Sequence, residues 1–213
     1  MAKIVLIGPL TKDLIRLGDV SRSALGGSVY YAGEAFNIFG HDVIMIPLFS
    51  KENNSFLRDI HKNIGVKPVY VQNTFLFENI YQAKDVFNRK QKILKPAFQQ
   101  TGISVAQIPE KEIKTADIIF LGPQSPFEIP LEVIKHIYSS NKNICLYAQG
   151  FFRSFYETEI KEEGWKEAGD YLKLVKILIL SEKHLRALSK DAELETSLRE
   201  VSKMGPSEII VNL

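Results

Sequence analysis

Six short apolar runs, several of them followed by glycine or proline, constrain the fold of this chain more than any other feature. They cover residues 3–7, 42–49, 117–121, 144–148, 175–180 and 208–213. Such runs are typical of strands buried inside a sheet, and the segments between them carry helical periodicity or helix caps. Alternating strands and helices imply βαβ units, so we expect a parallel sheet with helices on both faces.

Capping residues place helices at about residues 28–39, 54–64, 130–137, 181–188 and 192–204. Residues 10–25 and 66–105 do not fit the alternation, because they are β-prone and lack a helical period. We expect both segments to contribute a small β-sheet, the lid, over one edge of the core. No repeat or low-complexity linker divides the chain, so residues 1–213 are expected to form a single α/β domain.

The composition excludes several classes of protein. With 45% hydrophobic and 24% charged residues, the chain is expected to be a soluble globular domain, not a disordered or fibrous one. Its single cysteine, Cys145, leaves no disulfide framework and no cysteine-rich zinc site. No apolar run is long enough to span a membrane, and the N-terminus has no signal-peptide pattern, so we expect a cytoplasmic protein.

The balance of charges argues against a nucleic-acid partner, and the lack of a long apolar run argues against a membrane. The 27 basic and 25 acidic residues are interspersed, whereas nucleic-acid binders gather basic residues on one face. We interpret the densest basic stretch as the solvated edge of a hairpin. It comprises Lys84, Arg89, Lys90, Lys92 and Lys95.

Familiar motifs for phosphate loops, zinc and nucleophilic serine are absent. The sequence has no GxxxxGK[ST], GxGxxG, HExxH or GxSxG, and its four histidines are scattered. We therefore expect no metal site. Cys145 lies in an expected buried strand, where a thiol is usually inert.

Three positions point to ligand binding at the carboxyl ends of strands. Gly26, Gly27 and Ser28 precede a helix, whose N–H groups can hold a hydroxyl or an anion; the alternative is a tight turn that needs glycine. Asp13 follows the first strand and can accept hydrogen bonds from sugar hydroxyls; the alternative is a turn aspartate. Gln124 follows another strand in the same way.

Several segments together resemble the ribokinase-like (PfkB) carbohydrate kinases, over nearly the whole chain. They are KIVLIGPLTKDLI, LGGSVYYAGEAFNIFGHDVIMIPLFSKE, TFLFENIYQAKDVFNRKQ, IIFLGPQSPFEIP, LYAQGFFRSF, LILSEKHLRAL and GPSEIIVNL. The resemblance implies a doubly wound, mostly parallel α/β sheet with helices on both faces and a small β-sheet lid. It also implies phosphoryl transfer from ATP, with Mg²⁺, to a hydroxyl of a small-molecule sugar or nucleoside.

The resemblance assigns roles to individual residues. Asp13 matches the aspartate that binds substrate hydroxyls, and Gly26 and Gly27 match the substrate-binding di-glycine. Tyr31 stands where the family usually has a substrate-binding asparagine, so we expect its phenol to reshape or fill the sugar pocket. Lids in this family often pair, which implies a homodimer formed through the lid.

Two departures from the family pattern affect the implied activity. The family's glycine-rich anion hole and catalytic aspartate lie after the last strand, so the catalytic residues are expected beyond Leu213 and the C-terminal part of the fold is expected to be missing. The family's Asn-x-x-Glu motif reads Ser181-Glu182-Lys183-His184 here. We expect Ser181, Glu182 and His184 to mark a degenerate nucleotide or phosphate region.

Three hypotheses remain open at this point. The first is a sugar or nucleoside kinase lacking its C-terminal part, so that the 213 residues are inactive and ATP and Mg²⁺ act only if that segment exists. The second is a non-catalytic relative that binds a sugar, a nucleoside or a protein partner. The third is a structural domain that assembles through its lid.

Overall fold

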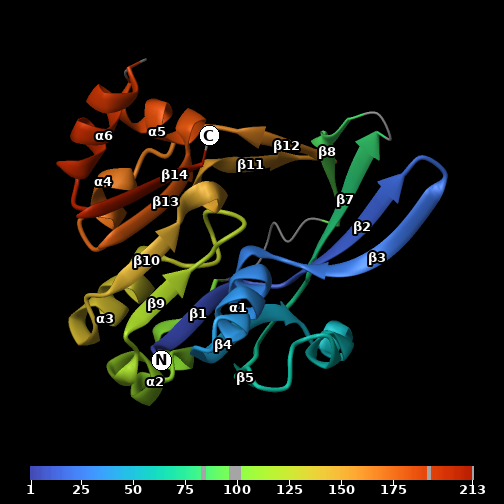
Figure 1. Ribbon diagram of the computed structural model, residues 1–213, viewed down its shortest axis with the longest axis horizontal. Coiled ribbons are helices and arrows are strands. Elements are labelled where there is room, and N and C mark those ends of the chain that lie inside the picture. Colours follow the sequence, from blue (N-terminus) through green and yellow to red (C-terminus); the bar gives the residue numbers. More distant parts are fainter. Residues whose placement is uncertain (83–84, 96–101, 191–192, 213) are drawn as a thin grey trace.

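The core of the molecule is a parallel sheet. A computed structural model describes residues 1–82, 85–95, 102–190 and 193–212 (Figure 1). The core strands are β1 (Lys3–Pro9), β4 (Asp42–Ser50), β5 (Gly65–Val66), β6 (Val69–Val71), β9 (Ile118–Leu121), β10 (Ile144–Tyr147), β13 (Ile177–Ser181) and β14 (Glu208–Asn212). Seven of them run in the order β14-β13-β10-β9-β1-β4-β5, and β6 also pairs with β4. Every pair is parallel, as the buried apolar runs predict.

Helices cover both faces of this sheet. One face carries α1 (Ser28–Ile38) and the 3-10 helix η1 (Lys51–Arg58); the other carries α2 (Glu110–Thr115), α3 (Leu131–Ser140), α4 (Ala168–Leu172), α5 (Glu182–Ser189) and α6 (Leu194–Ser202). Alternate residues of β1 serve the two sides. Ile4 and Leu6 pack toward α1, whereas Val5 and Ile7 pack toward α2 and α3. The predicted doubly wound α/β architecture is confirmed.

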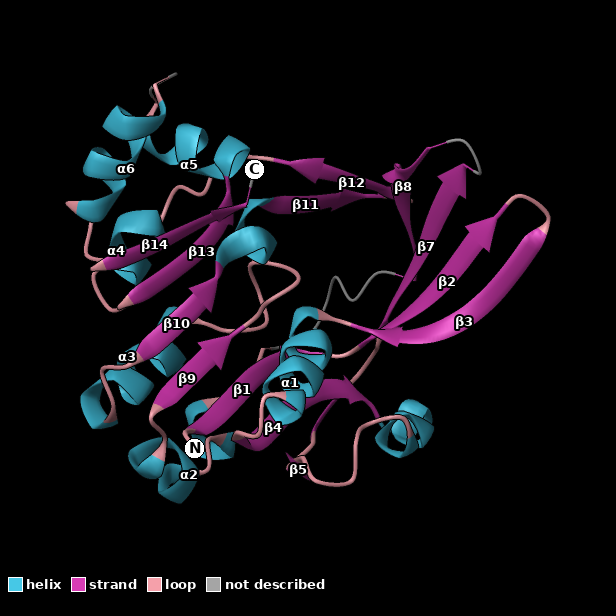
Figure 2. Cartoon of the chain, in the orientation of Figure 1, coloured by secondary structure: helices cyan, strands magenta, loops and turns pink. Residues whose placement is uncertain are grey.

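A second sheet, the lid, stands beside the core (Figure 2). It consists of β2 (Thr11–Leu17), β3 (Val20–Gly26), β7 (Phe75–Gln82) and β8 (Asp85–Lys95), in the order β3-β2-β7-β8. The hairpin of β11 (Arg153–Tyr156) and β12 (Glu159–Glu162) reaches from the core to β8 in Figure 2. There the Ile93 N–H donates to Thr158 O at 3.0 Å, and Phe155 and Ile160 pack on the buried cluster of Phe75, Phe77 and Ile93.

The chain crosses between core and lid at closely spaced points. Only Leu10 separates β1 from β2; it is fully buried, and its N–H donates to Leu48 O at 3.0 Å. Strand β3 returns from the lid at Gly26 and leads directly into α1. The base of the lid is therefore fixed against the carboxyl end of β1.

Two expectations differ from the structure. Residues 66–71 belong to the core sheet and not to the lid, because β5 and β6 pair with β4. Ile103, at the end of the segment expected in the lid, also packs in the core, and residues 96–101 lie outside the described residues.

The helix expected at 54–64 is the shorter η1. Its start is irregular, because Asn53 is non-helical and its Oδ1 accepts a hydrogen bond from Ser50 Oγ at 2.9 Å. No helix in the described parts of the chain is long and apolar enough to cross a membrane.

Candidate functional site

A polar cavity of about 160 Å³ lies where the lid meets the carboxyl ends of β1, β9 and β10. The lid contributes Thr11, Asp13, Phe77, Arg89 and Gln91. The core contributes Gly27, Ser28, Tyr31, Gln124, Tyr147, Gln149 and Arg153. Ligands bind at this edge in open α/β sheets, so the cavity is the candidate site.

Asp13 is the carboxylate of this cavity. Its side chain is held from two lid strands: Thr11 Oγ1 donates to Oδ1 at 2.8 Å, and Asn79 Nδ2 donates to Oδ2 at 3.0 Å. Burial raises the pKa of Asp13, while these two hydrogen bonds and the positive charges of Arg89 and Arg153 act against the rise. Each carboxylate oxygen has two lone pairs, so both oxygens keep room for a ligand hydroxyl.

Gly26 and Gly27 let the backbone pass close to Asp13. A Cβ at Gly26 would lie 2.6 Å from Thr11 Oγ1 and 2.7 Å from Asp13 Oδ2. Gly27 has φ +107°, and a Cβ there would lie 2.5 Å from Pro9 O. Helix α1 begins directly afterwards with no side-chain cap, which leaves its first N–H groups for a ligand.

The other residues predicted from the sequence lie around the same cavity. Ser28 Oγ donates to Gly122 O at 2.8 Å, which ties the start of α1 to the loop after β9. Tyr31 lines the cavity but does not fill it, since its side chain is 57% exposed. Burial and the nearby charge of Asp13 raise the pKa of this phenol.

Gln124 is held by a buried carboxyl group that no pattern in the sequence singles out. Gln124 N and Ser125 N each donate to Glu128 Oε2 at 2.7 Å, and Ser125 Oγ donates to Glu128 Oε1. Glu128 is only 2% exposed, and burial raises its pKa to about 7. The glutamate fixes the turn that presents the Gln124 amide to the cavity.

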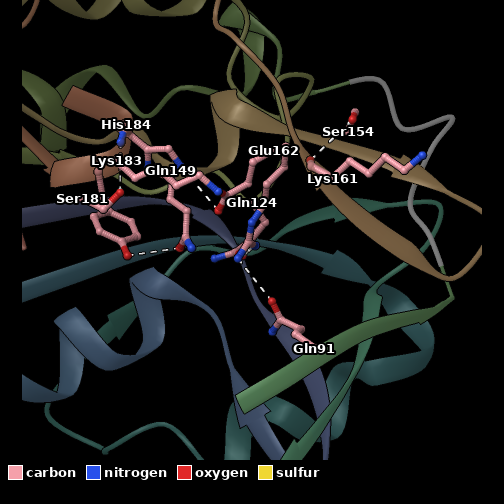
Figure 3. Close-up of polar contacts among 11 residues, drawn as sticks. Gln91, Gln124, Gln149, Ser154, Lys161, Glu162, Ser181, Lys183 and His184 are labelled. Atoms are coloured by element: carbon pink, nitrogen blue, oxygen red, sulfur yellow. Dashed lines mark hydrogen bonds and ion pairs between the residues drawn. The ribbon is translucent and has the colours of Figure 1, made fainter. Parts of the chain in front are cut away.

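Arg153 connects this turn to the lid. Its Nη1 donates to Gln124 Oε1 at 2.6 Å and its Nη2 donates to Gln91 Oε1 at 3.3 Å. Gln91 Nε2 in turn donates to Asn79 Oδ1 at 2.9 Å. Figure 3 shows Gln91 on the lid strand and Gln124 on the core side of this network. A continuous chain of hydrogen bonds therefore runs from Gln124 to Asp13.

Arg89 has a second role that the interpretation of the basic stretch as a solvated edge does not include. It is exposed on the edge strand β8, like Lys90 and Lys92, but it also lines the cavity; Lys84 lies outside the described residues. Arg89 and Gln91 share one face of β8, as alternate residues of a strand do. Polar residues at alternate positions of the lid strands are the signal in the sequence that marks this face.

Ser181, Glu182 and His184 do not line this cavity. Ser181 Oγ caps α5 by accepting from His184 N at 3.2 Å, and Glu182 pairs with Arg186. The His184 ring stacks on Phe152 with centroids 4.2 Å apart, and burial lowers its pKa. Figure 3 shows Ser181, Lys183 and His184 away from Gln91. In the described ranges no three His, Cys, Asp or Glu side chains are grouped to hold a metal.

Comparisons with known proteins find solved structures with a similar fold but no relative by sequence. No family model matches the chain, and no curated protein matches it. A pyrophosphate-dependent kinase in the ribokinase family, complexed with a pyrophosphate analog and myo-inositol, superposes with a TM-score of 0.80 at 18% identity, over 99% of this chain and 72% of that one.

Two further solved structures are similar. Ribokinase from Arabidopsis thaliana, complexed with ribose and ATP, gives a TM-score of 0.72 at 13% identity, over 99% of this chain and 71% of that one. Adenosine kinase from Sinorhizobium meliloti gives 0.75 at 11% identity, over 99% of this chain and 75% of that one.

Proposed function

Since the chain has the ribokinase-like fold, we propose that its cavity binds a small polyhydroxylated molecule, a sugar or a polyol, at Asp13. The carboxylate of Asp13 inside the cavity is the observation that carries this proposal. Its oxygens accept from ligand hydroxyls, while the amides of Gln124 and Gln149 and the start of α1 supply donors. Two of the fold neighbours were solved with molecules of this class, myo-inositol and ribose.

The size of the cavity favours a sugar or polyol over a nucleoside. Pockets for drug-sized ligands measure roughly 300–1,000 Å³. At about 160 Å³, this cavity holds a smaller molecule.

Binding of D-ribose and myo-inositol to the 213-residue chain tests the proposal. Calorimetry and thermal shift are expected to detect at least one of them, and Asp13→Asn is expected to abolish the signal. Asp170→Asn is the matched control, because Asp170 pairs with Lys173 on the surface of α4. If no polyhydroxylated compound binds, or if binding survives Asp13→Asn, the proposal is wrong.

ATP-dependent phosphorylation of the bound molecule is the second candidate function. The solved structures that superpose on nearly the whole chain are kinases. In the region expected to be a degenerate nucleotide or phosphate region, Ser181, Glu182 and His184 each have a partner within the protein. That observation favours a non-catalytic, ligand-binding relative. Transfer of radiolabelled phosphate from ATP to the polyol that binds decides between the two.

A homodimer through the lid is a further part of the proposal. Strand β3 is an edge strand of the lid sheet, and at its turn with β2 the paired Leu17 and Val20 are 44% and 70% exposed. Exposed apolar residues at a strand edge favour pairing with another strand. Sedimentation velocity is expected to show a dimer that Val20→Lys dissociates; a wild-type monomer would contradict it.

A further inference from the structure

We propose that the molecule bound at Asp13 also carries a negatively charged group, a carboxylate or a phosphate, and that Arg153 and Arg89 bind that group. This inference rests on the proposed function and narrows its ligand to an anionic sugar or polyol.

Arg153 is a buried cation held by neutral partners. Only 7% of the residue is exposed, and its two hydrogen bonds go to the amide oxygens of Gln124 and Gln91. Among the residues that the structure describes, Arg153 makes no ion pair with a carboxylate. Burying an unpaired charge is costly, and a guanidinium has five N–H groups, more than these two bonds use.

Neighbouring carboxyl groups do not pair with Arg153. Glu162 stands opposite Arg153 on the hairpin and its negative charge raises the pKa of Arg153, but its carboxylate forms its ion pair with Lys183. Glu128 is protonated for much of the time near neutral pH, since its pKa is about 7. Both oxygens of Asp13 are held by Thr11 and Asn79. Asp13 is linked to Arg153 only through Asn79 and Gln91, and no ion pair joins the two side chains within the described ranges.

A second cation faces the same cavity. Arg89 lies two residues before Gln91 on β8 and lines the cavity with Arg153. Its positive charge disfavours the charged form of Arg153 and lowers that group's pKa, although burial contributes more. The cavity lining therefore has two guanidinium groups against one carboxylate, and the start of α1 adds a positive dipole end.

The arrangement gives the ligand two distinct ends. Hydroxyl groups meet Asp13, and an anionic group meets the guanidinium groups, which bind planar carboxylate or phosphate oxygens in pairs. If Arg153 only connected the lid to the core, the cavity would bind a charged ligand and its neutral counterpart with equal affinity.

Matched ligands separate these two roles. D-Gluconate and D-glucitol have the same carbon chain and differ by a carboxylate at one end, and D-ribose 5-phosphate and D-ribose differ by a phosphate. Calorimetry on the 213-residue chain is expected to show at least tenfold tighter binding of the charged member in one pair. The pair that shows it distinguishes a carboxylate ligand from a phosphate ligand.

Variants test whether the arginines cause the preference. Arg89→Gln changes an exposed residue and is expected to fold normally, while reducing the charged-over-neutral preference at least tenfold. Arg153→Lys keeps the charge and is expected to retain part of the preference for the charged ligand. Arg153→Gln is expected to lose that preference. Asp13→Asn is expected to abolish binding of the neutral member and to weaken binding of the charged one.

Three outcomes would overturn the inference. Equal, Asp13-dependent binding of charged and neutral members overturns it and leaves the proposed function standing. Failure of all four compounds overturns the inference, and failure of myo-inositol as well overturns the proposed function too. Binding of inorganic phosphate as tightly as ribose 5-phosphate, unaffected by Asp13→Asn, means that the arginines hold an isolated phosphate and not the charged end of a polyol.

Discussion

Asn79 holds the carboxylate of Asp13 from the neighbouring lid strand, with its Nδ2 3.0 Å from Asp13 Oδ2. Its own oxygen accepts from Gln91, and it is only 2% exposed. Asn79 therefore orients Asp13 and stabilises its ionised form, which is the form that accepts from ligand hydroxyls.

Asn79→Ala is expected to weaken ligand binding and to move its pH dependence. The hydrogen bond from Asn79 lowers the pKa of Asp13, so its loss raises that pKa further. As pH falls, affinity is then lost at a higher pH than in wild type. Leaving Asp13 and Gln91 with unpaired atoms is expected to lower the free energy of unfolding by about 1–3 kcal/mol.

Calorimetry from pH 4 to 8 and urea unfolding measure these two effects. Asn54→Ala is the control, because the exposed Asn54 accepts a surface hydrogen bond from Tyr70. An unchanged pH profile in Asn79→Ala would show that Asn79 does not act through Asp13.

Glu128 is expected to make the protein less stable as pH rises. Its folded pKa is about 7, above the ordinary value of 4.5, so its favourable contribution is complete below pH 4.5 and is lost as pH rises to 7. The full loss is on the order of 3 kcal/mol at about 1.4 kcal/mol for each pKa unit.

Glu128→Gln keeps the shape and cannot ionise. Urea unfolding between pH 4.5 and 8 is expected to show that stability falls with pH in wild type more than in Glu128→Gln. Parallel curves would mean that Glu128 titrates near its ordinary pKa.

His184 is expected to act in the opposite direction, below neutral pH. Burial lowers the pKa of His184 below its ordinary value of 6.5. As pH falls below 6.5, the unfolded chain takes up a proton at His184 before the folded protein does, so the folded protein loses stability. Neither ring nitrogen makes a hydrogen bond within the described residues, although Nε2 lies 3.5 Å from Glu162 Oε1.

His184→Phe keeps the stacking on Phe152 and removes the titrating group. The variant is expected to be at least as stable as wild type at pH 7 and more stable at pH 5. His136→Phe, at a partly exposed histidine, serves as the comparison. Greater destabilisation of His184→Phe at pH 5 than at pH 7 would contradict the prediction.

Gly150→Ala is expected to disturb both stability and ligand binding. A Cβ at Gly150 would collide with Pro123 O and lie 2.9 Å from the backbone carbon of Gln124, so the turn that carries Gln124 has to move. The expected loss is about 1–3 kcal/mol, typical of overpacking.

Gly169→Ala is the matched control, since a Cβ there meets nothing within 4 Å and the residue lies in α4. Alanine at that helical position is expected to raise stability by up to about 1 kcal/mol. Thermal unfolding with and without the polyol measures both effects. Equal stability of the two variants would show that the contact at Gly150 relaxes without cost.

The sequence predicts the core and five of the twelve residues that line the candidate site. Asp13, Gly27 and Gln124 are recognisable because each follows a strand or precedes a helix at the edge where ligands bind. Arg153 and Gln91 are not recognisable, because their role depends on the lid closing over the core.

The hairpin of β11 and β12 is not predicted from the sequence, for a local reason. Its turn uses Glu157 with φ +52°, where glycine or asparagine is the usual signal. Glu128 is not predicted as a buried residue, because a glutamate after a strand is normally exposed. Its burial follows only from the packing of the turn at Gln124.

Backbone contacts at glycines form the floor beneath the cavity. Gly8 approaches Gly122, Gly27 approaches Pro9, and Gly150 approaches Pro123, each too closely for a methyl group. Substitution at these glycines would force the backbone to move, so side chains in this floor can hardly be changed. A change of ligand preference therefore has to come from the lid and its rim, where Arg89 and Tyr31 are exposed enough to vary while the scaffold beneath them stays constant.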